Sequence, residues 1–99
     1  MANKAYWIAR VDVSDPAGFQ AYSDANPAIF AKFDGHFIVR SNRFDCVEGE
    51  SRSRHVVVEF PDYASAVACY RSPEYQANVK ARLPYSTVDL VIVEGCDGP

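Results

Sequence analysis

The sequence contains few of the residues that build metal sites and disulfide frameworks. Its three cysteines, Cys46, Cys69 and Cys96, are odd in number and widely spaced, and they form no Cys-x-x-Cys motif. The two histidines, His36 and His55, belong to different expected strands and form no His-x-His or His-x-x-x-His pair. These spacings exclude the usual zinc motifs and favour reduced thiols over a disulfide-stabilised secreted domain.

Other motifs with a defined chemistry are also missing. The five glycines are isolated, so there is no glycine-rich phosphate loop, and no Gly-x-Ser-x-Gly elbow is present. No apolar run approaches the ~18 residues of a membrane span, and the N-terminus lacks a signal-peptide core. A formal charge of −3 gives no electrostatic basis for binding nucleic acid or an anionic membrane. We expect a cytoplasmic protein with no cofactor, metal, nucleic-acid partner or membrane.

The 99 residues do provide a regular succession of strand and helix signals, which predicts a single domain over residues 1–99 with a core at about 5–95. Residues 5–13 alternate between two faces, as expected for a strand. The face assigned to the helix side carries Trp7, Ala9, Val11 and Val13, and the other face carries Tyr6, Ile8, Arg10 and Asp12.

A first helix is expected to begin at Ser14-Asp15-Pro16, which combines a capping side chain with proline at the first helical position. Pro27 removes a backbone donor inside the pattern, so we expect a kink or a break near Asn26. Gly35 is expected to end the helical region as its left-handed cap.

The second half of the chain predicts three more strands and a broken helix. Strands are expected at 36–40, with a bulge or bend at 41–42 and a continuation over 43–47, then at 55–60 and 88–93. A polar hairpin loop is expected at 48–53 and a loose tail at 94–99. Pro61 and Asp62 mark the start of the second helix, and Ser72-Pro73 marks a restart within it.

The resulting order, β-α-β-β-α-β, predicts an α+β, ferredoxin-like fold with a four-stranded antiparallel sheet and helices on one face. The strands at 55–60 and 88–93 are apolar on both faces, as Val56-Val57-Val58 and Leu90-Val91-Ile92-Val93 illustrate. A bare second face of this kind is larger than the apolar patch that a monomer commonly exposes. We therefore expect a two-fold homodimer joined sheet to sheet.

Five short segments together resemble one protein family: Ala5-Tyr6-Trp7-Ile8, Val13-Ser14-Asp15-Pro16, Phe33-Asp34-Gly35-His36-Phe37, Glu59-Phe60-Pro61 and Tyr70-Arg71-Ser72-Pro73-Glu74-Tyr75-Gln76. They resemble the domain of unknown function 1330, in the dimeric α+β barrel superfamily, although Asp34 stands where that family usually has a second glycine. The resemblance implies the same fold and dimer. It implies no agreed reaction, because the wider superfamily includes cofactor-free monooxygenases, lactone isomerases and proteins without demonstrated catalysis.

A set of aromatic and polar side chains is expected to converge between the sheet and the helices. The ligand-binding candidates are Trp7, Tyr22, Tyr70, Tyr75, Arg71 and Arg82, with Arg40 also able to reach the mouth of a cleft. His36 is the one weak candidate for a general base. The alternative is that the rings are packed core, that His36 and His55 are exposed strand-end residues, and that the arginines pair with nearby acids.

Two functions follow from these alternatives, and the sequence does not decide whether the protein is an enzyme. One is a cofactor-free protein that binds or converts a small aromatic or carbonyl compound. The other is a non-catalytic homodimeric module, structural or stress-related, with no ligand pocket. A cavity above ~300 Å³ reached by at least two of Trp7, Tyr22, His36 and Tyr75 would favour the first.

Overall fold

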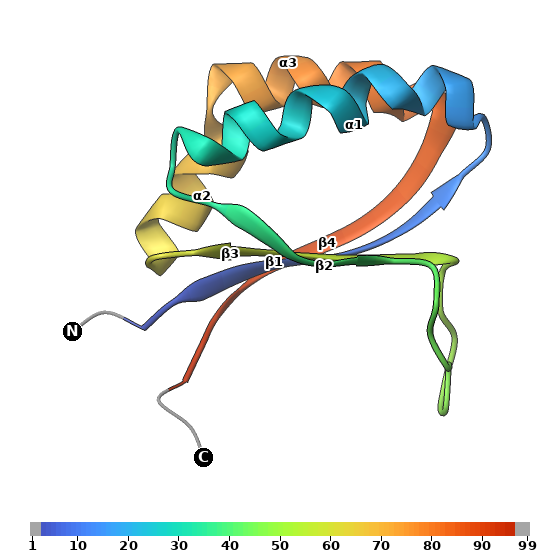
Figure 1. The fold of residues 1–99 in the computed structure, drawn as a ribbon, viewed down its shortest axis with the longest axis horizontal. Coiled ribbons are helices and arrows are strands. Elements are labelled where there is room, and N and C mark those ends of the chain that lie inside the picture. The colour runs from blue at the N-terminus through green and yellow to red at the C-terminus, as the bar shows by residue number, and fades with distance from the viewer. Residues whose placement is uncertain (1–2, 97–99) are drawn as a thin grey trace.

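A computed structural model describes residues 3–96 as a sheet with helices packed on one of its faces (Figure 1). The elements are β1 (Ala5–Val13), α1 (Pro16–Ala31), β2 (His36–Ser41), β3 (Arg54–Phe60), α2 (Tyr63–Arg71), α3 (Pro73–Arg82), a 3₁₀ turn (Leu83–Tyr85) and β4 (Ser86–Glu94). The strands pair antiparallel in the order β2-β3-β1-β4. This confirms the ferredoxin-like α+β fold, with the second helix divided in two.

Strand β1 lies at the centre of the molecule, and its alternation matches the prediction. Trp7 lies opposite Val58 of β3 and Ile92 of β4, and all three face the helices. The next positions along β1 on this face, Ala9 and Val11, are also buried. The core therefore lies between this face of the sheet and the helices.

Helix α1 begins as predicted, because the Asp15 side chain accepts from two backbone N–H groups of the first turn and Pro16 follows it. The break expected near Asn26 is wrong, since α1 runs through Pro27 as one helix. Proline removes only one backbone hydrogen bond there. Ile29 and Phe30, just beyond it, are buried in the core and hold the last turn in place.

The end of α1 also differs from the prediction. Asp34, not Gly35, adopts the left-handed conformation, with φ of 59°. The N–H of Gly35 donates to the carbonyl of Phe30 at 2.8 Å. A Cβ at Gly35 would lie 2.4 Å from the Phe60 ring, so glycine is needed there because a ring packs against its backbone.

Strand β2 contains a bulge that the sequence placed elsewhere. Its register against β3 shifts between Phe37 and Val39, not at 41–42. As a result, Phe37 and Arg40 both face the helices. The strand expected over 43–47 is also wrong: residues 42–53 form an arm without regular structure, and Figure 1 shows it projecting beyond the sheet on the side away from the helices.

The restart of the second helix is confirmed. Asp62 accepts from the N–H of Ser65 at 2.7 Å, and this bond lowers the pKa of its carboxyl. The Ser72 hydroxyl donates to the carbonyl of Cys69 and accepts from the N–H of Tyr75. Cys69 is fully buried, and burial raises the pKa of its thiol to about 12. It is a core residue and remains a neutral thiol.

The outer face of the sheet, meaning the face away from the helices, is apolar, as the sequence predicted. Ile8, Val39, Val91 and Val93 are between 40% and 55% exposed there. No helix among residues 3–96 covers these side chains.

Candidate functional site

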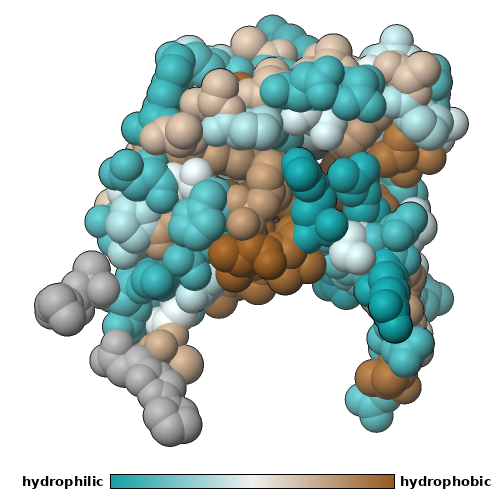
Figure 2. All heavy atoms as spheres, viewed as in Figure 1, coloured by the Kyte–Doolittle hydropathy of each residue, from teal (hydrophilic) through white to brown (hydrophobic). Residues whose placement is uncertain are grey.

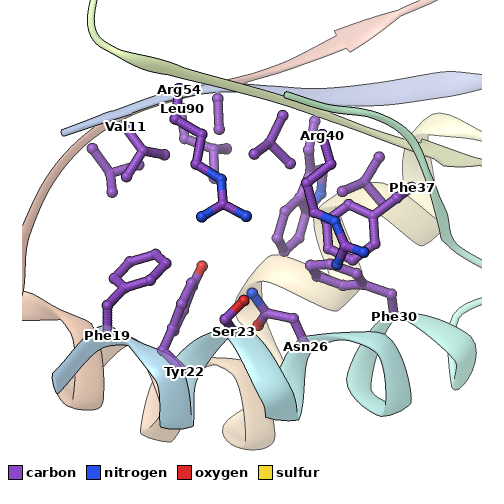
Figure 3. Close-up of a pocket in the computed structure, with 15 residues that line it drawn as sticks. Val11, Phe19, Tyr22, Ser23, Asn26, Phe30, Phe37, Arg40, Arg54 and Leu90 are labelled. Carbon is purple, nitrogen blue, oxygen red and sulfur yellow. The ribbon is translucent and has the colours of Figure 1, made fainter. Parts of the chain in front are cut away.

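A small cavity of about 50 Å³ lies between α1 and the sheet (Figure 3). Its apolar walls include Trp7, Ala9, Val11, Phe19, Phe30, Phe37, Val56, Val58, Val88 and Leu90. Its polar lining residues are Tyr22, Ser23 and Asn26 on α1, Arg40 on β2 and Arg54 on β3. No carboxylate is among the described residues that line it.

An open groove of about 650 Å³ adjoins this cavity. The two hollows share the lining residues Phe19, Ser23, Arg40 and Arg54, which therefore lie at their junction. Neither hollow alone meets the criterion of a cavity above ~300 Å³ reached by two of the candidate side chains. Trp7 and Tyr22 both line the cavity, but its volume is far below that limit. The groove is large enough, but neither Trp7 nor Tyr22 lines it. Together they suit a ligand with one end in the cavity and the remainder in the groove.

The two arginines at the junction of cavity and groove point from the sheet toward α1 (Figure 3). The bulge turns Arg40 to this side, with its Cζ 4.6 Å from the centre of the Phe37 ring. Neither Arg40 nor Arg54 pairs with a carboxylate within residues 3–96. Figure 2 shows a hydrophobic patch at the level of the sheet, below the helices, with strongly hydrophilic residues beside it.

Trp7 forms the inner wall and is itself firmly packed. Its indole N–H donates to the carbonyl of Ala66 at 2.9 Å. The Phe30 and Tyr75 rings meet it edge to face, with centroids 5.1 and 4.8 Å away. Edge-to-face packing and a satisfied N–H are typical of a core tryptophan. Trp7 therefore limits the depth of the cavity.

Behind the cavity lies a buried cluster formed by Tyr22, Tyr75 and Arg82. The two tyrosine hydroxyl oxygens are 2.6 Å apart. The Cζ of Arg82 lies 5.4 Å from the centre of the Tyr22 ring. Arg82 is 7% exposed, and its Nε has no hydrogen-bond partner among the described residues. Only Tyr22 of the three lines the cavity.

The remaining sequence-predicted candidates lie elsewhere. Arg71 is exposed at the end of α2. Tyr70 packs 5.7 Å from Trp7 but does not line the cavity. His36 is exposed on the outer face, where its Nε2 lies 3.7 Å from Glu59. It is therefore on the wrong side of the sheet to act as a base in this cavity.

Several lining residues were not singled out from the sequence. Arg54 shares its face with Val56, Val58 and Phe60, so the strand alternation carried a signal for it. Asn26 lies one helical turn from Tyr22, and its Oδ1 accepts from the Asn78 amide at 2.9 Å. The position of Arg40 depends on the bulge between Phe37 and Val39, and no local pattern around Ile38 indicates that bulge.

Within residues 3–96 no helix is long and apolar enough to cross a membrane. No group of three or more metal-ligating side chains occurs in the same described part of the chain. The three cysteines are free.

The fold and its one-sided helical layer define a ferredoxin-like α+β protein. The chain belongs to the family described as a domain of unknown function (DUF1330), whose sequence model matches residues 4–96. None of the curated proteins matches the chain.

Solved structures with the same fold come from several bacteria. A protein of unknown function from Rhodopseudomonas palustris is 17% identical, with a TM-score of 0.77 over 99% of this chain and 86% of that one. SnoaB, a cofactor-independent oxygenase from Streptomyces nogalater, is 17% identical, with a TM-score of 0.67 over 98% and 97%. A dimeric ferredoxin-like protein of unknown function from Bacteroides fragilis is 16% identical, with a TM-score of 0.59 over 93% and 96%.

Proposed function

We propose that this protein binds a small organic anion with a flat, apolar body in the hollow between α1 and the sheet. The observation that carries the proposal is the pair of arginines, Arg40 and Arg54, at the junction of an apolar cavity and an open groove. Ligand sites are typically apolar hollows with a few convergent polar groups. Arginine is well suited to bind anionic oxygens through its fork of donors.

The distribution of charge supports an anion over a neutral or cationic ligand. The whole chain has 13 acidic and 10 basic residues. The described lining of the cavity has two arginines and no acid, and the groove adds a single carboxylate, Asp24. A ligand anion would supply the counter-charge that Arg40 and Arg54 lack.

Conversion of that ligand without a cofactor is the enzymatic form of this proposal. The support is the likeness in fold to SnoaB, which is described as a cofactor-independent oxygenase. Tyr22, Ser23 and Asn26 supply neutral hydrogen-bonding groups in the cavity. Such groups can orient a substrate and stabilise a developing negative charge.

We further propose that the working form is a cytoplasmic homodimer joined through the outer faces of two sheets. The exposed apolar side chains of that face support the homodimer, and two of the similar solved structures are described as dimeric. The arm at residues 42–53 adds a further argument, because it projects past the outer face and carries Phe44 and Val47, which are 42% and 86% exposed. In a sheet-to-sheet dimer this arm would lie against the second subunit. The three free thiols are consistent with a reducing compartment.

One observation favours the second candidate, a dimeric module without a ligand. Trp7, Phe30 and Tyr75 pack against one another between the helices and the sheet, and the enclosed cavity is small. The two candidates differ in the role of Arg40 and Arg54, which a module without a ligand does not need.

Thermal shift with benzoates, phenols, aromatic keto acids and lactones tests the two candidates. A ligand present at about 100 times its dissociation constant stabilises the protein by about 2.7 kcal/mol. We expect the anionic compounds to stabilise the wild type and to lose most of this effect in the Arg40→Ala/Arg54→Ala double variant. The matched control is Arg43→Ala, which removes an exposed arginine of the arm outside both hollows. Stabilisation by none of these compounds, or equal stabilisation of both variants, would overturn the ligand proposal.

A further inference from the structure

We propose that Tyr22 is the hydrogen-bond donor that selects an ionised oxygen, so that the site takes a phenol or an enol as its oxyanion. This inference rests on the proposed function, since it assigns the chemistry of the same anion. The oxyanion would lie between the Tyr22 hydroxyl and the Arg54 guanidinium, which point toward each other across the hollow (Figure 3).

The hydroxyl pair allows the Tyr22 proton to point into the cavity, because either hydroxyl can be the donor in the bond between them. Tyr75 is fully buried, and burial together with its Tyr22 neighbour raises the pKa of its hydroxyl. Tyr75 therefore keeps its proton and can donate it to the Tyr22 oxygen at 2.6 Å. That arrangement leaves the proton of Tyr22 for a ligand in the cavity. Hydrogen bonds in series also polarise each other, which makes Tyr22 a stronger donor.

The charged side chains that line the cavity or pack on Tyr22 all have the same sign, and Asp24 of α1 lines only the adjoining groove. Arg40 comes from β2, Arg54 from β3 and Arg82 from α3, while the residues of β1 and β4 that line the cavity are apolar. Arg82 is buried and has no carboxylate partner within residues 3–96. A buried charge without a partner is costly to a fold, so its retention here is consistent with a role toward a bound anion.

The positive charges of these arginines favour the ionised form of a ligand over its neutral form. On binding, the ligand O–H bond breaks, the electron pair stays on the oxygen, and the proton passes to solvent through the open groove. No oxidation or reduction takes place. The result is an activated phenolate or enolate held against the aromatic walls.

The geometry favours the single oxygen of a phenolate or enolate over a carboxylate. A carboxylate is bound best by the two parallel donors of an arginine fork, which Arg40 and Arg54 offer at the wet side of the hollow. Tyr22 instead offers one donor, and its ring packs 5.2 Å from that of Phe19 inside the apolar lining. The single Tyr22 hydroxyl donor, surrounded by aromatic rings, therefore matches a ligand with one anionic oxygen on a flat, apolar body.

The test uses 4-nitrophenol, whose ionised form absorbs visible light, in a pH titration with and without the protein. We expect binding to lower the apparent pKa of the dye by at least about one unit, which corresponds to a tenfold preference for the phenolate. Tyr22→Phe should remove most of that shift and weaken phenolate binding about tenfold. Tyr75→Phe, which changes only a positioning residue, should reduce the shift while the dye still binds.

Tyr70→Phe is the matched control, because Tyr70 packs on the same aromatic cluster but its hydroxyl reaches neither the cavity nor the tyrosine pair. It should leave the dye titration unchanged. Benzoate is the second probe, and its affinity for the protein should depend on Arg40 and Arg54 more than on Tyr22.

The outcomes separate this inference from the proposal on which it rests. If benzoate binds but the dye does not, or if the dye binds with an unshifted pKa, the oxyanion assignment is overturned and the organic-anion site stands. A shift that survives in Tyr22→Phe overturns the role of Tyr22. If neither benzoate nor the dye binds, both proposals are overturned.

Discussion

The two faces of the sheet differ in how they accommodate charge. On the helix side, Arg40 and Arg82 lie over aromatic rings and Arg54 lines the cavity, and none of the three meets a carboxylate within residues 3–96. On the outer face, one arginine, Arg52, binds Asp12 and Asp89 at 2.9 and 2.8 Å. The helix side thus has three arginines without a carboxylate partner among residues 3–96, whereas Arg52 on the outer face is paired twice beside bare apolar side chains.

This difference agrees with our proposal that the two faces bind different partners. Unpaired cations in an apolar hollow suit a small anion, because the ligand completes the charge balance. Paired charges around exposed valines and Ile8 suit another protein surface, because pairing removes the electrostatic penalty of covering them. The predictions below test this division, starting with the largest expected effect.

Placing a charge on the bare apolar surface should break the dimer. Val91 is 55% exposed and lies opposite Ile8 on the outer face, so Val91→Glu should leave the monomer folded. Two-fold symmetry would bring a glutamate from each subunit into the interface, where like charges and desolvation cost several kcal/mol. Light scattering at micromolar concentration should give a dimer for the wild type and a monomer for the variant.

The control for this experiment is Leu83→Glu. Leu83 is 60% exposed on the 3₁₀ turn, away from the outer face, and the change should leave the dimer intact. A wild-type protein that is monomeric at this concentration would refute the sheet-to-sheet dimer.

The helix side of the sheet should tolerate an added methyl group less well than the arm does. Gly35→Ala would place a Cβ 2.4 Å from the Phe60 ring and should lower the free energy of unfolding by about 2–3 kcal/mol through overpacking. Gly49→Ala is the comparison on the arm, where the Cβ meets nothing within 4 Å and only a φ of 75° opposes the change. We expect a loss of about 1 kcal/mol there. Urea unfolding measures both, and equal losses would contradict tight packing at Gly35.

The break between α2 and α3 positions Tyr75 beneath the cavity, and Ser72 stabilises that break. Ser72→Ala removes the side chain that accepts from the Tyr75 N–H and should cost about 1 kcal/mol in unfolding free energy. Ser14→Ala is the control, since Ser14 also precedes a helix but makes no side-chain hydrogen bond among the described residues. If the two variants were equally stable, Ser72 would not act as a cap.

Local signals in the sequence were sufficient to predict most of the fold. The alternation around Trp7 assigned the faces of β1, and the Ser72-Pro73 pair located the division of the second helix. These features depend on neighbouring residues along the chain, so sequence patterns report them. The packing of Gly35 on Phe60 joins residues far apart in the chain, and no local pattern indicates it.

The candidate site was predicted less completely, because it depends on the register between strands. Trp7, Tyr22 and Arg40 were singled out and do line the cavity, and Arg54 could have been found from its alternation with Val56. The side that Arg40 faces is set by the bulge after Phe37, which reverses the alternation of β2. A one-residue shift moves every later side chain to the opposite face, so an unpredicted bulge leaves the assignment of Arg40 uncertain from sequence alone.

The smallest expected effect concerns the paired charges of the outer face, which hold the base of the arm. The backbone N–H of Ser53, followed by the Arg52 guanidinium, lowers the pKa of the Asp12 carboxyl below its usual value of 3.8. A lowered pKa means that this stabilisation is complete above about pH 4 and is lost as the pH falls through the folded-state value.

We therefore expect amide hydrogen exchange in residues 42–53 to accelerate slightly, after correction for the intrinsic effect of pH, only when the medium is more acidic than about pH 4. Arg52→Ala should produce a similar acceleration at neutral pH, because it removes the bonds to Asp12 and Asp89 without any titration. Amides of β1, the strand that carries Asp12, should remain protected in both cases. Equal acceleration in β1 and in the arm would show that acid loosens the sheet as a whole, and that these charge pairs do not specifically hold the arm.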